Sequence, residues 1–223
     1  VLSMVIFTVI FGGLARVDSD GMPYALFSYA ALVPWLYFST ALSASALSLV
    51  NNTDMLTKVY FPRLIFPLTP VFSKLVDFVI SFAVVFVLMA WFHVAPTARM
   101  LYLPLLILLM MLATAGISLW FAAMSVHYRD VKHAMPFVTQ ILMYAAPVVW
   151  SAALIEERFG QAGRLVFGLY PMVGVIEGFR VALLDTGPMP WDMLAVGTAS
   201  ALLLFVTGLF YFRRMEVNFA DVA

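Results

Sequence analysis

Long stretches without a charged side chain constrain this chain more than any other feature of its sequence. Charged residues divide it into six apolar blocks, at residues 1–15, 21–53, 78–98, 100–128, 134–155 and 193–212. All but the first can hold the ~20 residues that a membrane-spanning helix needs. Strands of a membrane barrel would instead alternate in polarity over about ten residues. We therefore expect an all-α, polytopic integral membrane protein with six transmembrane helices.

The first block is shorter than the others. Residues 1–15 would rise only about 22 Å as a helix at ~1.5 Å per residue, which is less than the ~30 Å hydrocarbon core of a bilayer. No basic segment precedes the block, so a signal peptide is not favoured. We expect residues 1–15 to be the remainder of a longer first span, and residues 1–223 to form a single membrane domain.

Composition excludes several classes of function. The chain is 64% hydrophobic and only 11% charged, against about 45–50% and about 25% in soluble domains. Its twelve basic and twelve acidic residues cancel, so no net charge favours nucleic acid as a partner. The absence of cysteine excludes a disulfide, a thiolate metal site or a cysteine nucleophile. No Gly-x-x-x-x-Gly-Lys-Ser/Thr loop occurs, so ATP hydrolysis would require a partner chain.

Positions of charges and tryptophans predict the orientation. Arg213 and Arg214 directly follow the last apolar block, and the positive-inside rule places such residues in the cytoplasm. With six crossings, both ends of the chain lie on that side. Trp91, Trp150 and Trp191 then fall at the outer interface, where indole rings are enriched.

Two polar connections face the cytoplasm in this arrangement. Residues 51–63 contain a capping residue, a turn or two of mixed polarity and then Pro62, which predicts a short interfacial helix, with a plain connecting loop as the alternative. Residues 127–133 hold five ionisable side chains in seven positions. His127 and His133 alone are weak evidence for a metal site, so a solvated loop that faces a partner is the better interpretation.

An external segment between residues 152 and 191 is too apolar for a solvated loop. Pro171 can begin a helix, and Asp185-Thr186-Gly187-Pro188 would end it. Within it Met172, Val175, Ile176, Phe179 and Leu183 share one face, while Glu177 and Arg180 project elsewhere and can pair across one turn. This pattern predicts an amphipathic helix that either lies on the bilayer or dips into it as a gate.

Aromatic side chains occur near the middle of the second span. Trp35, Tyr37 and Phe38 could stack on sugar rings or line a conduit, although ordinary helix packing also explains each of them. Further along, Ala41, Ala44, Ser45 and Ser48 form a stripe of small residues that suits close helix packing.

Lys74 and Asp77 stand three residues apart near the expected inner end of the third span. We expect them to neutralise each other on one helix face, with Lys74 reaching toward the interface; an ion or proton relay is the alternative.

Several motifs resemble a known family. They are Lys58-Val59-Tyr60-Phe61-Pro62-Arg63, Tyr128-Arg129-Asp130-Val131, Pro171 with Ile176-Glu177-Gly178-Phe179-Arg180, and Tyr211-Phe212-Arg213-Arg214-Met215-Glu216 followed by Phe219-Ala220-Asp221-Val222. In this order they resemble the membrane subunits of ABC-2-type transporters that export O-antigen, capsular polysaccharide and teichoic acid. Family members carry an amphipathic interfacial helix and the start of the first span upstream of the region matched here.

The resemblance implies a homodimeric permease of the bacterial cytoplasmic membrane, in contact with membrane lipids, that moves a lipid-linked glycan. ATP and Mg would bind a separate ATPase subunit, and this chain would need no cofactor or metal. Residues 51–63 would form the coupling helix, with the loop at residues 129–130 as a second contact. The implied coupling residues are Asp54, Lys58, Tyr60, Arg63, Arg129 and Asp130, and the implied external gate residues are Pro171, Glu177, Phe179 and Arg180.

Other functions remain open on the sequence alone. An ABC-2 exporter of drugs or small lipids would share these motifs. A polyprenyl-phosphate glycosyltransferase would need acidic residues clustered at one interface, and no such motif gathers around Glu156, Glu157 or Glu177. A passive channel or scaffold would work without any ATPase.

Overall fold

The computed structural model describes residues 2–14, 21–52, 62–128, 130–150 and 152–216, and all the regular elements among them are helical. The first part of the chain forms α1 (Leu2–Phe7), the π-helix η1 (Thr8–Leu14), α2 (Tyr24–Ala46) and α3 (Ser48–Asn51). The middle part forms α5 (Ile65–Trp91), the 3₁₀-helix η2 (Ala98–Tyr102) and α6 (Leu103–His127). The last part forms α7 (Val131–Ala145), α8 (Ala153–Gly168), α9 (Pro171–Leu184) and α10 (Trp191–Glu216).

Four helices in the described part of the chain are long and apolar enough to cross a membrane: α2, α5, η2 continued by α6, and α10. The count becomes five if α8 and α9, bent by 110° at their junction, are taken as one span. An all-helical, polytopic membrane protein is therefore confirmed. The other two predicted spans are shorter among the described residues, because α7 has only 15 residues and residues 2–14 divide into α1 and η1.

The third predicted span begins earlier than expected, at Ile65 rather than near Phe78. The helix therefore includes Pro67, Lys74 and Asp77, which precede the apolar block at residues 78–98. Pro67 falls in the first turn, where a backbone N–H would have no intrahelical partner, so a proline costs little there. Lys74 and Asp77 pair with each other at 2.8 Å, so their charges do not end the apolar helix.

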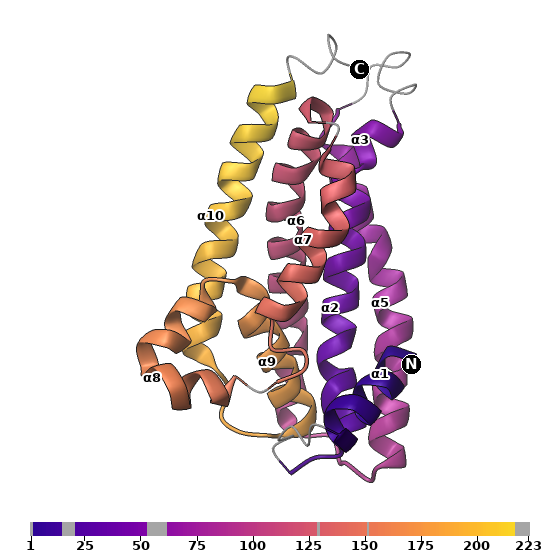
Figure 1. Cartoon of the computed structure of the whole chain (residues 1–223), viewed down its shortest axis with the longest axis vertical. Coiled ribbons are helices and arrows are strands. Elements are labelled where there is room, and N and C mark those ends of the chain that lie inside the picture. The colour runs from indigo at the N-terminus through magenta and orange to yellow at the C-terminus, as the bar shows by residue number, and fades with distance from the viewer. Residues whose placement is uncertain (1, 15–20, 53–61, 129, 151, 217–223) are drawn as a thin grey trace.

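The long helices form an elongated bundle in which the chain runs repeatedly from one end to the other (Figure 1). α2, α6 and α10 run toward the end where α10 finishes, which we call the C-terminal end. α5 and α7 run in the other direction, toward the opposite end. Residues 51, 52, 62 and 63 and residues 128 and 130, which flank the two predicted cytoplasmic connections, therefore lie at the C-terminal end together with Glu216, as the sequence predicts.

α9 differs from the other helices in position. It runs from the middle of the bundle to the opposite end, beside the lower parts of α2, α6 and α10 (Figure 1). The pair formed by α8 and α9 thus enters the bundle from the opposite end and returns to it. The sequence left open whether this segment lies on the bilayer or dips inward, and the structure has it inside the bundle.

The best-packed helix pair is α6 and α10. A Cβ atom added at Gly116 of α6 would meet the backbone nitrogen of Phe205 at 2.8 Å. One added at Gly208 of α10 would meet the backbone oxygen of Gly116 at the same distance, 2.8 Å. The two backbones therefore touch where glycine removes the side chain, which is how helices approach closely in membranes.

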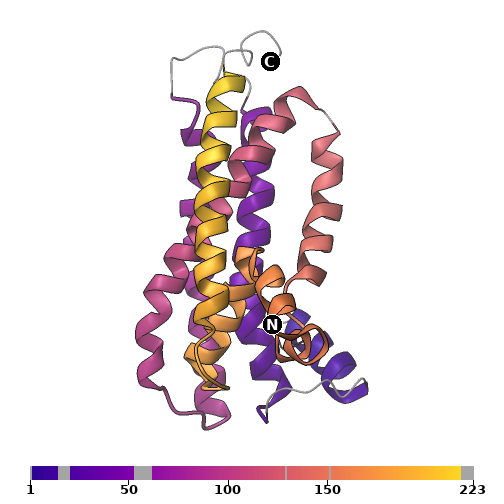
Figure 2. The same cartoon turned by 90° about the vertical axis from the view of Figure 1, so that its left-hand side faces the viewer.

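α7 is the most loosely attached of the longer helices. Figure 2 shows it on one side of the bundle, away from α10, and its main contacts are with α2 and α6. Phe137, Ile141 and Tyr144 on its outer face are exposed large apolar residues. Such a face suits lipid or another protein chain.

Candidate functional site

The C-terminal end of the bundle holds the described part of the predicted coupling surface. Asp54, Lys58, Tyr60 and Arg129 lie outside the described residues. Arg63 is described, and its guanidinium donates a hydrogen bond to the backbone carbonyl of Glu216, the last residue of α10. Arg63 therefore links the residues that precede α5 to the end of α10. A displacement of Arg63 would act on both α5 and α10.

Asp130, the remaining predicted coupling residue, stands directly before α7. Its side chain is exposed, while its backbone carbonyl accepts hydrogen bonds from the N–H groups of His133 and Ala134, both at 3.0 Å. The neighbouring Lys132 and His133 are exposed as well. This turn therefore presents charge to the surroundings at a fixed place on a helix start, which suits recognition of a partner. No three His, Asp or Glu side chains gather closely enough to hold a metal ion anywhere in the described ranges.

At the other end of the molecule, α9 is buried on nearly all sides. Pro171 is its first residue, where its missing N–H costs nothing. The helix ends at Asp185, which adopts the left-handed conformation with a φ of 56°. Between them every residue except Glu177 is buried. The interpretation as a helix lying on the bilayer, with a polar outer face, therefore does not describe α9.

Arg180 holds α9 to two other parts of the chain. Its side chain is 0% exposed, and its two terminal nitrogens donate to the backbone carbonyls of Val148, at 2.8 Å, and Trp150, at 2.9 Å. The guanidinium carbon lies 3.8 Å from the centre of the Phe27 ring of α2. The charge is thus enclosed by carbonyl oxygens and an aromatic face.

Glu177 completes this arrangement as the counter-charge. Its carboxylate accepts a hydrogen bond from Arg180 at 3.3 Å, and its own side chain is 13% exposed. The predicted pair across one turn of the helix is confirmed. Its predicted location on an outward face is wrong, because Arg180 finds its backbone partners inside the bundle.

Phe179 joins α9 to α5 through aromatic contacts. Its ring lies 6.0 Å from the ring of Phe78 and 6.0 Å from that of Phe82, edge to face in both cases. Edge-to-face pairs of this kind add to the stability that burial alone provides. Phe179 and Arg180 therefore connect α9 to α5, to α2 and to the segment at residues 148–150, so α9 is a junction of the bundle.

The aromatic residues of α2 that were candidates for a conduit all have packing partners inside this chain. Trp35, Tyr37 and Phe38 are buried. The Tyr37 hydroxyl donates to the backbone carbonyl of Val71 at 2.7 Å, and the Phe38 ring contacts that of Tyr170 at 6.3 Å. Their role in lining a conduit stays a prediction.

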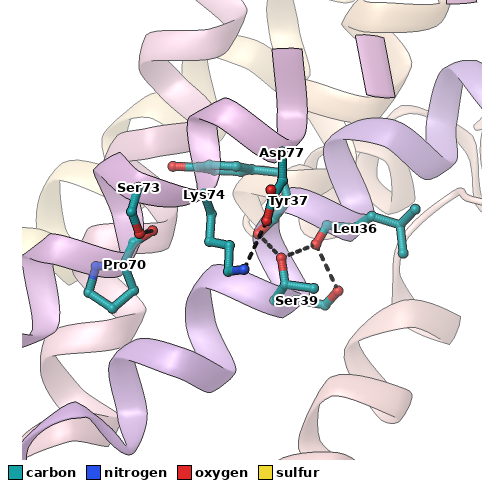
Figure 3. A network of polar contacts seen from close by, with 8 residues as sticks. Leu36, Tyr37, Ser39, Pro70, Ser73, Lys74 and Asp77 are labelled. Carbon is teal, nitrogen blue, oxygen red and sulfur yellow. Dashed lines mark hydrogen bonds and ion pairs between the residues drawn. The ribbon is translucent and has the colours of Figure 1, made fainter. Parts of the chain in front are cut away.

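Lys74 and Asp77 form the predicted ion pair on α5, at 2.8 Å. Figure 3 shows the ammonium of Lys74 reaching along α5 to the Asp77 carboxylate, beside the turn of α2 that contains Leu36 and Tyr37. The expected pairing on one helix face is confirmed, and the extension of Lys74 toward the interface stays a prediction. The side chains are 36% and 65% exposed, respectively.

Sequence reasoning missed a second charged cluster, on α8. Arg164 binds Glu156 of the same helix and makes two hydrogen bonds to Asp192 of α10, at 2.7 and 3.1 Å. This cluster connects α8 to the first turn of α10. Arg164 and Asp192 stand 28 positions apart, so no local spacing in the sequence predicts their contact.

Comparisons with known proteins agree with this architecture. Residues 1–184 match the model of the ABC-2 type transporter family. The chain is 26% identical over 221 residues to the O-antigen export system permease protein RfbA of Myxococcus xanthus, covering 99% of this chain and 83% of that protein. Two proteins of the same name from Klebsiella pneumoniae are 22% identical over 200 residues, which is 89% of this chain and 75% of theirs.

Membrane subunits of this family work with an ABC ATPase partner and are typically found in the bacterial cytoplasmic membrane. They are transport components without a catalytic domain and need no cofactor of their own. Because the family match includes 184 of the 223 residues, and the four long helices give it a multi-pass membrane architecture, this chain belongs to the ABC-2 type transporter family as a membrane permease subunit.

Proposed function

We propose that this chain is the permease of an exporter that moves a lipid-linked polysaccharide, of the O-antigen, capsule or teichoic acid type, across the bacterial cytoplasmic membrane. The observation that carries the proposal is the similarity to permeases named for O-antigen export, which extends over 89–99% of the chain. A separate ATPase subunit supplies the energy, and two copies of the chain form the path.

The C-terminal end of the bundle faces the cytoplasm in this proposal. Lys132, Arg213 and Arg214 lie at that end, as the positive-inside rule requires. Trp91 and Trp191 are exposed at the opposite end, where an outer aromatic belt would be. In this proposal residues 2–14 are the outer part of a longer first span and α7 is the fifth span, which brings the number of spans to six.

Coupling to the ATPase takes place at the connections of the C-terminal end. Residues 51–63, with Asp54, Lys58, Tyr60 and Arg63, dock on the ATPase, and Arg129 with Asp130 makes a second contact. The bond from Arg63 to Glu216 supports this proposal, because it gives a displaced connection a direct link to α10.

α9 acts as the external gate of the proposed exporter. Pro171 begins it in the middle of the bundle, and the contacts of Glu177, Phe179 and Arg180 connect it to α2, α5 and residues 148–150. Relative movement of these elements would therefore shift α9 and open the exit. The same movement of α2 would bring Trp35, Tyr37 and Phe38 to the wall of the conduit.

Charge reversal at the coupling contacts tests this function. In cells that depend on the permease for surface polysaccharide, the double variant Lys58→Glu and Arg129→Glu should abolish export and reduce the amount of ABC ATPase that co-purifies with the tagged permease. The reason is that repulsion at a contact fixed by charge prevents docking. Arg158→Glu, an exposed residue of α8 at the other end of the molecule, is the matched control.

Two results would contradict the proposal. Normal export by the double variant, at normal expression, would remove the coupling assignment. A permease-deficient strain that keeps its surface polysaccharide and instead accumulates a drug or a small lipid would favour the alternative, an ABC-2 exporter of such compounds.

A further inference from the structure

Between Thr69 and Val79, the exposed surface of α5 has a polar and an apolar side. Thr69, Ser73, Lys74 and Asp77 follow one another at helical spacing along one side, which we call the polar flank. Phe72, Val76 and Val79 occupy the other side, the apolar flank, and their exposed fractions are 61–63%. A helix surrounded by lipid has no physical reason to separate its residues in this way.

The polar flank lies near the middle of α5, and a hydrocarbon core centred on this helix would place it deep in the membrane. Lys74 and Asp77 are nine and twelve residues after Ile65, the first residue of α5. At ~1.5 Å per residue, Asp77 is about 18 Å from one end of this helix and about 21 Å from the other. A ~30 Å hydrocarbon core centred on α5 therefore has Asp77 near its middle.

Both charges are accessible from outside the protein at this depth. The Asp77 side chain is 65% exposed and that of Lys74 is 36% exposed. Ionisable residues inside a membrane are costly, and they almost always face the protein interior or a water-filled cavity rather than lipid. Their ion pair of 2.8 Å reduces this cost. The other lone pairs of the carboxylate and the other N–H groups of the ammonium still need hydrogen-bond partners.

Hydroxyl groups continue the polar surface on α5 and onto α2. Thr69 donates to the backbone carbonyl of Ile65 at 2.8 Å, and Thr40 of α2 donates to that of Leu36 at 2.7 Å. With its hydrogen directed to its own helix, each hydroxyl offers oxygen lone pairs to an incoming donor. The bond from Tyr37 to the carbonyl of Val71 fixes α2 beside this part of α5, and Figure 3 shows the resulting arrangement.

We propose that the polar flank of α5, with the adjoining turn of α2 at residues 36–40, faces water within the membrane and contacts the hydroxyl-rich part of the exported molecule. The inference rests on the function proposed above and specifies where the path runs. Exposed carboxylate, ammonium and hydroxyl oxygens suit a ligand that both donates and accepts hydrogen bonds, as a glycan does, and they do not suit acyl chains. The apolar flank of the same helix faces lipid.

Single cysteines test the hydration of the flank, because the chain contains no native cysteine. Ser73→Cys reports on the polar flank. Phe72→Cys, at almost the same depth, and Val79→Cys, close to the middle of the helix, are controls on the apolar flank. The complex of permease and ATPase in lipid nanodiscs is treated with a charged methanethiosulfonate reagent, which reacts with thiolates and therefore needs water.

We expect Ser73→Cys to react at least about tenfold faster than either control, because a thiol in lipid seldom ionises. Equal rates at all three positions would overturn the proposal. So would a disulfide that joins Ser73→Cys of two copies, since that result would make the flank an interface between subunits. If Ser73→Cys does not yield folded complex, Thr69→Cys on the same flank replaces it.

Contact with the cargo is tested in membranes from cells that make the lipid-linked glycan and from cells that do not. The glycan should slow labelling of Ser73→Cys and leave the controls unchanged. An unchanged rate at Ser73→Cys, in a variant that still exports, would overturn the contact while leaving the exporter function intact. Loss of export in all cysteine variants and in the unmodified protein would instead contradict the proposed function itself.

Discussion

Arg180 shows how this fold accommodates a charge at a fully buried position. Its donors reach two backbone carbonyls and the carboxylate of Glu177, while its planar face lies over Phe27. Arginine suits this environment because its guanidinium is planar, carries five N–H donors and stacks on aromatic rings. The side chain therefore connects α9 to α2 and to residues 148–150.

Replacing this arginine should destabilise the protein strongly. Arg180→Met removes all the donors and leaves the carboxylate of Glu177, whose side chain is only 13% exposed, without its counter-charge; breaking a buried ion pair in this way typically costs about 3–5 kcal/mol. We expect the melting temperature in detergent to fall on the order of 10 °C. The melting temperature of Arg180→Lys should lie between those of the unmodified protein and Arg180→Met, because a single ammonium cannot reproduce the planar, forked set of guanidinium donors.

The control for this prediction is Arg158→Met, in which an exposed arginine of α8 is lost. Its melting temperature should remain close to that of the unmodified protein. A similar melting temperature for Arg180→Met and Arg158→Met would show that the buried arginine contributes no net stability.

At the scale of elements, the contact between α6 and α10 depends on two glycines. Gly116 and Gly208 have no room for a Cβ atom, since each would meet backbone atoms at 2.8 Å. Backbone cannot move aside as a flexible side chain can. These two helices therefore form a fixed pair, in contrast to α7 with its exposed outer face.

Gly116→Ala should separate α6 from α10 and lower stability by about 1–3 kcal/mol, the usual cost of overpacking a tight contact. The measurement is thermal unfolding in detergent, in which the fraction of protein that remains monodisperse is recorded as the temperature rises. Gly187→Ala is the matched control, because a Cβ atom there meets no atom within 4 Å. Equal unfolding temperatures for the two alanine variants would contradict the tight contact.

The apolar blocks predict the long helices well but not where each begins. The sequence predicts that Lys74 and Asp77 neutralise each other, and they do so within α5. The length of the apolar block does not predict that the helix extends back through them to Ile65. For α9, local spacing predicts the pair of Glu177 and Arg180. It cannot predict the burial of Arg180, whose partners Val148 and Trp150 are 32 and 30 positions away.

At the scale of the whole molecule, the two ends of the bundle differ in character. The C-terminal end carries α3, the start of α5, the start of α7 and the end of α10, whereas α8, the end of α9 and the start of α10 lie at the opposite end (Figure 1). A signal generated at one end must travel along the long helices to the other. The proposed orientation makes this a path from the cytoplasm to the exit.

Accessibility from outside intact cells tests this orientation. Gly187→Cys should react with a membrane-impermeant thiol reagent added to intact cells, because it lies in the connection between α9 and α10. Asp130→Cys, in the exposed turn before α7, should react only after the cells are opened. Labelling of position 130 and not 187 in intact cells would invert the topology.

The bent pair of α8 and α9 also bears on how the protein is made. Membrane insertion proceeds along the chain as it is synthesised, and a helix that carries a full charge enters lipid at a cost. Arg180 takes its carbonyl partners from Val148 and Trp150, which are synthesised before it. α9 can therefore reach its buried position only once residues 148–150 are in place, and α10, which is synthesised after α9, packs against it afterwards.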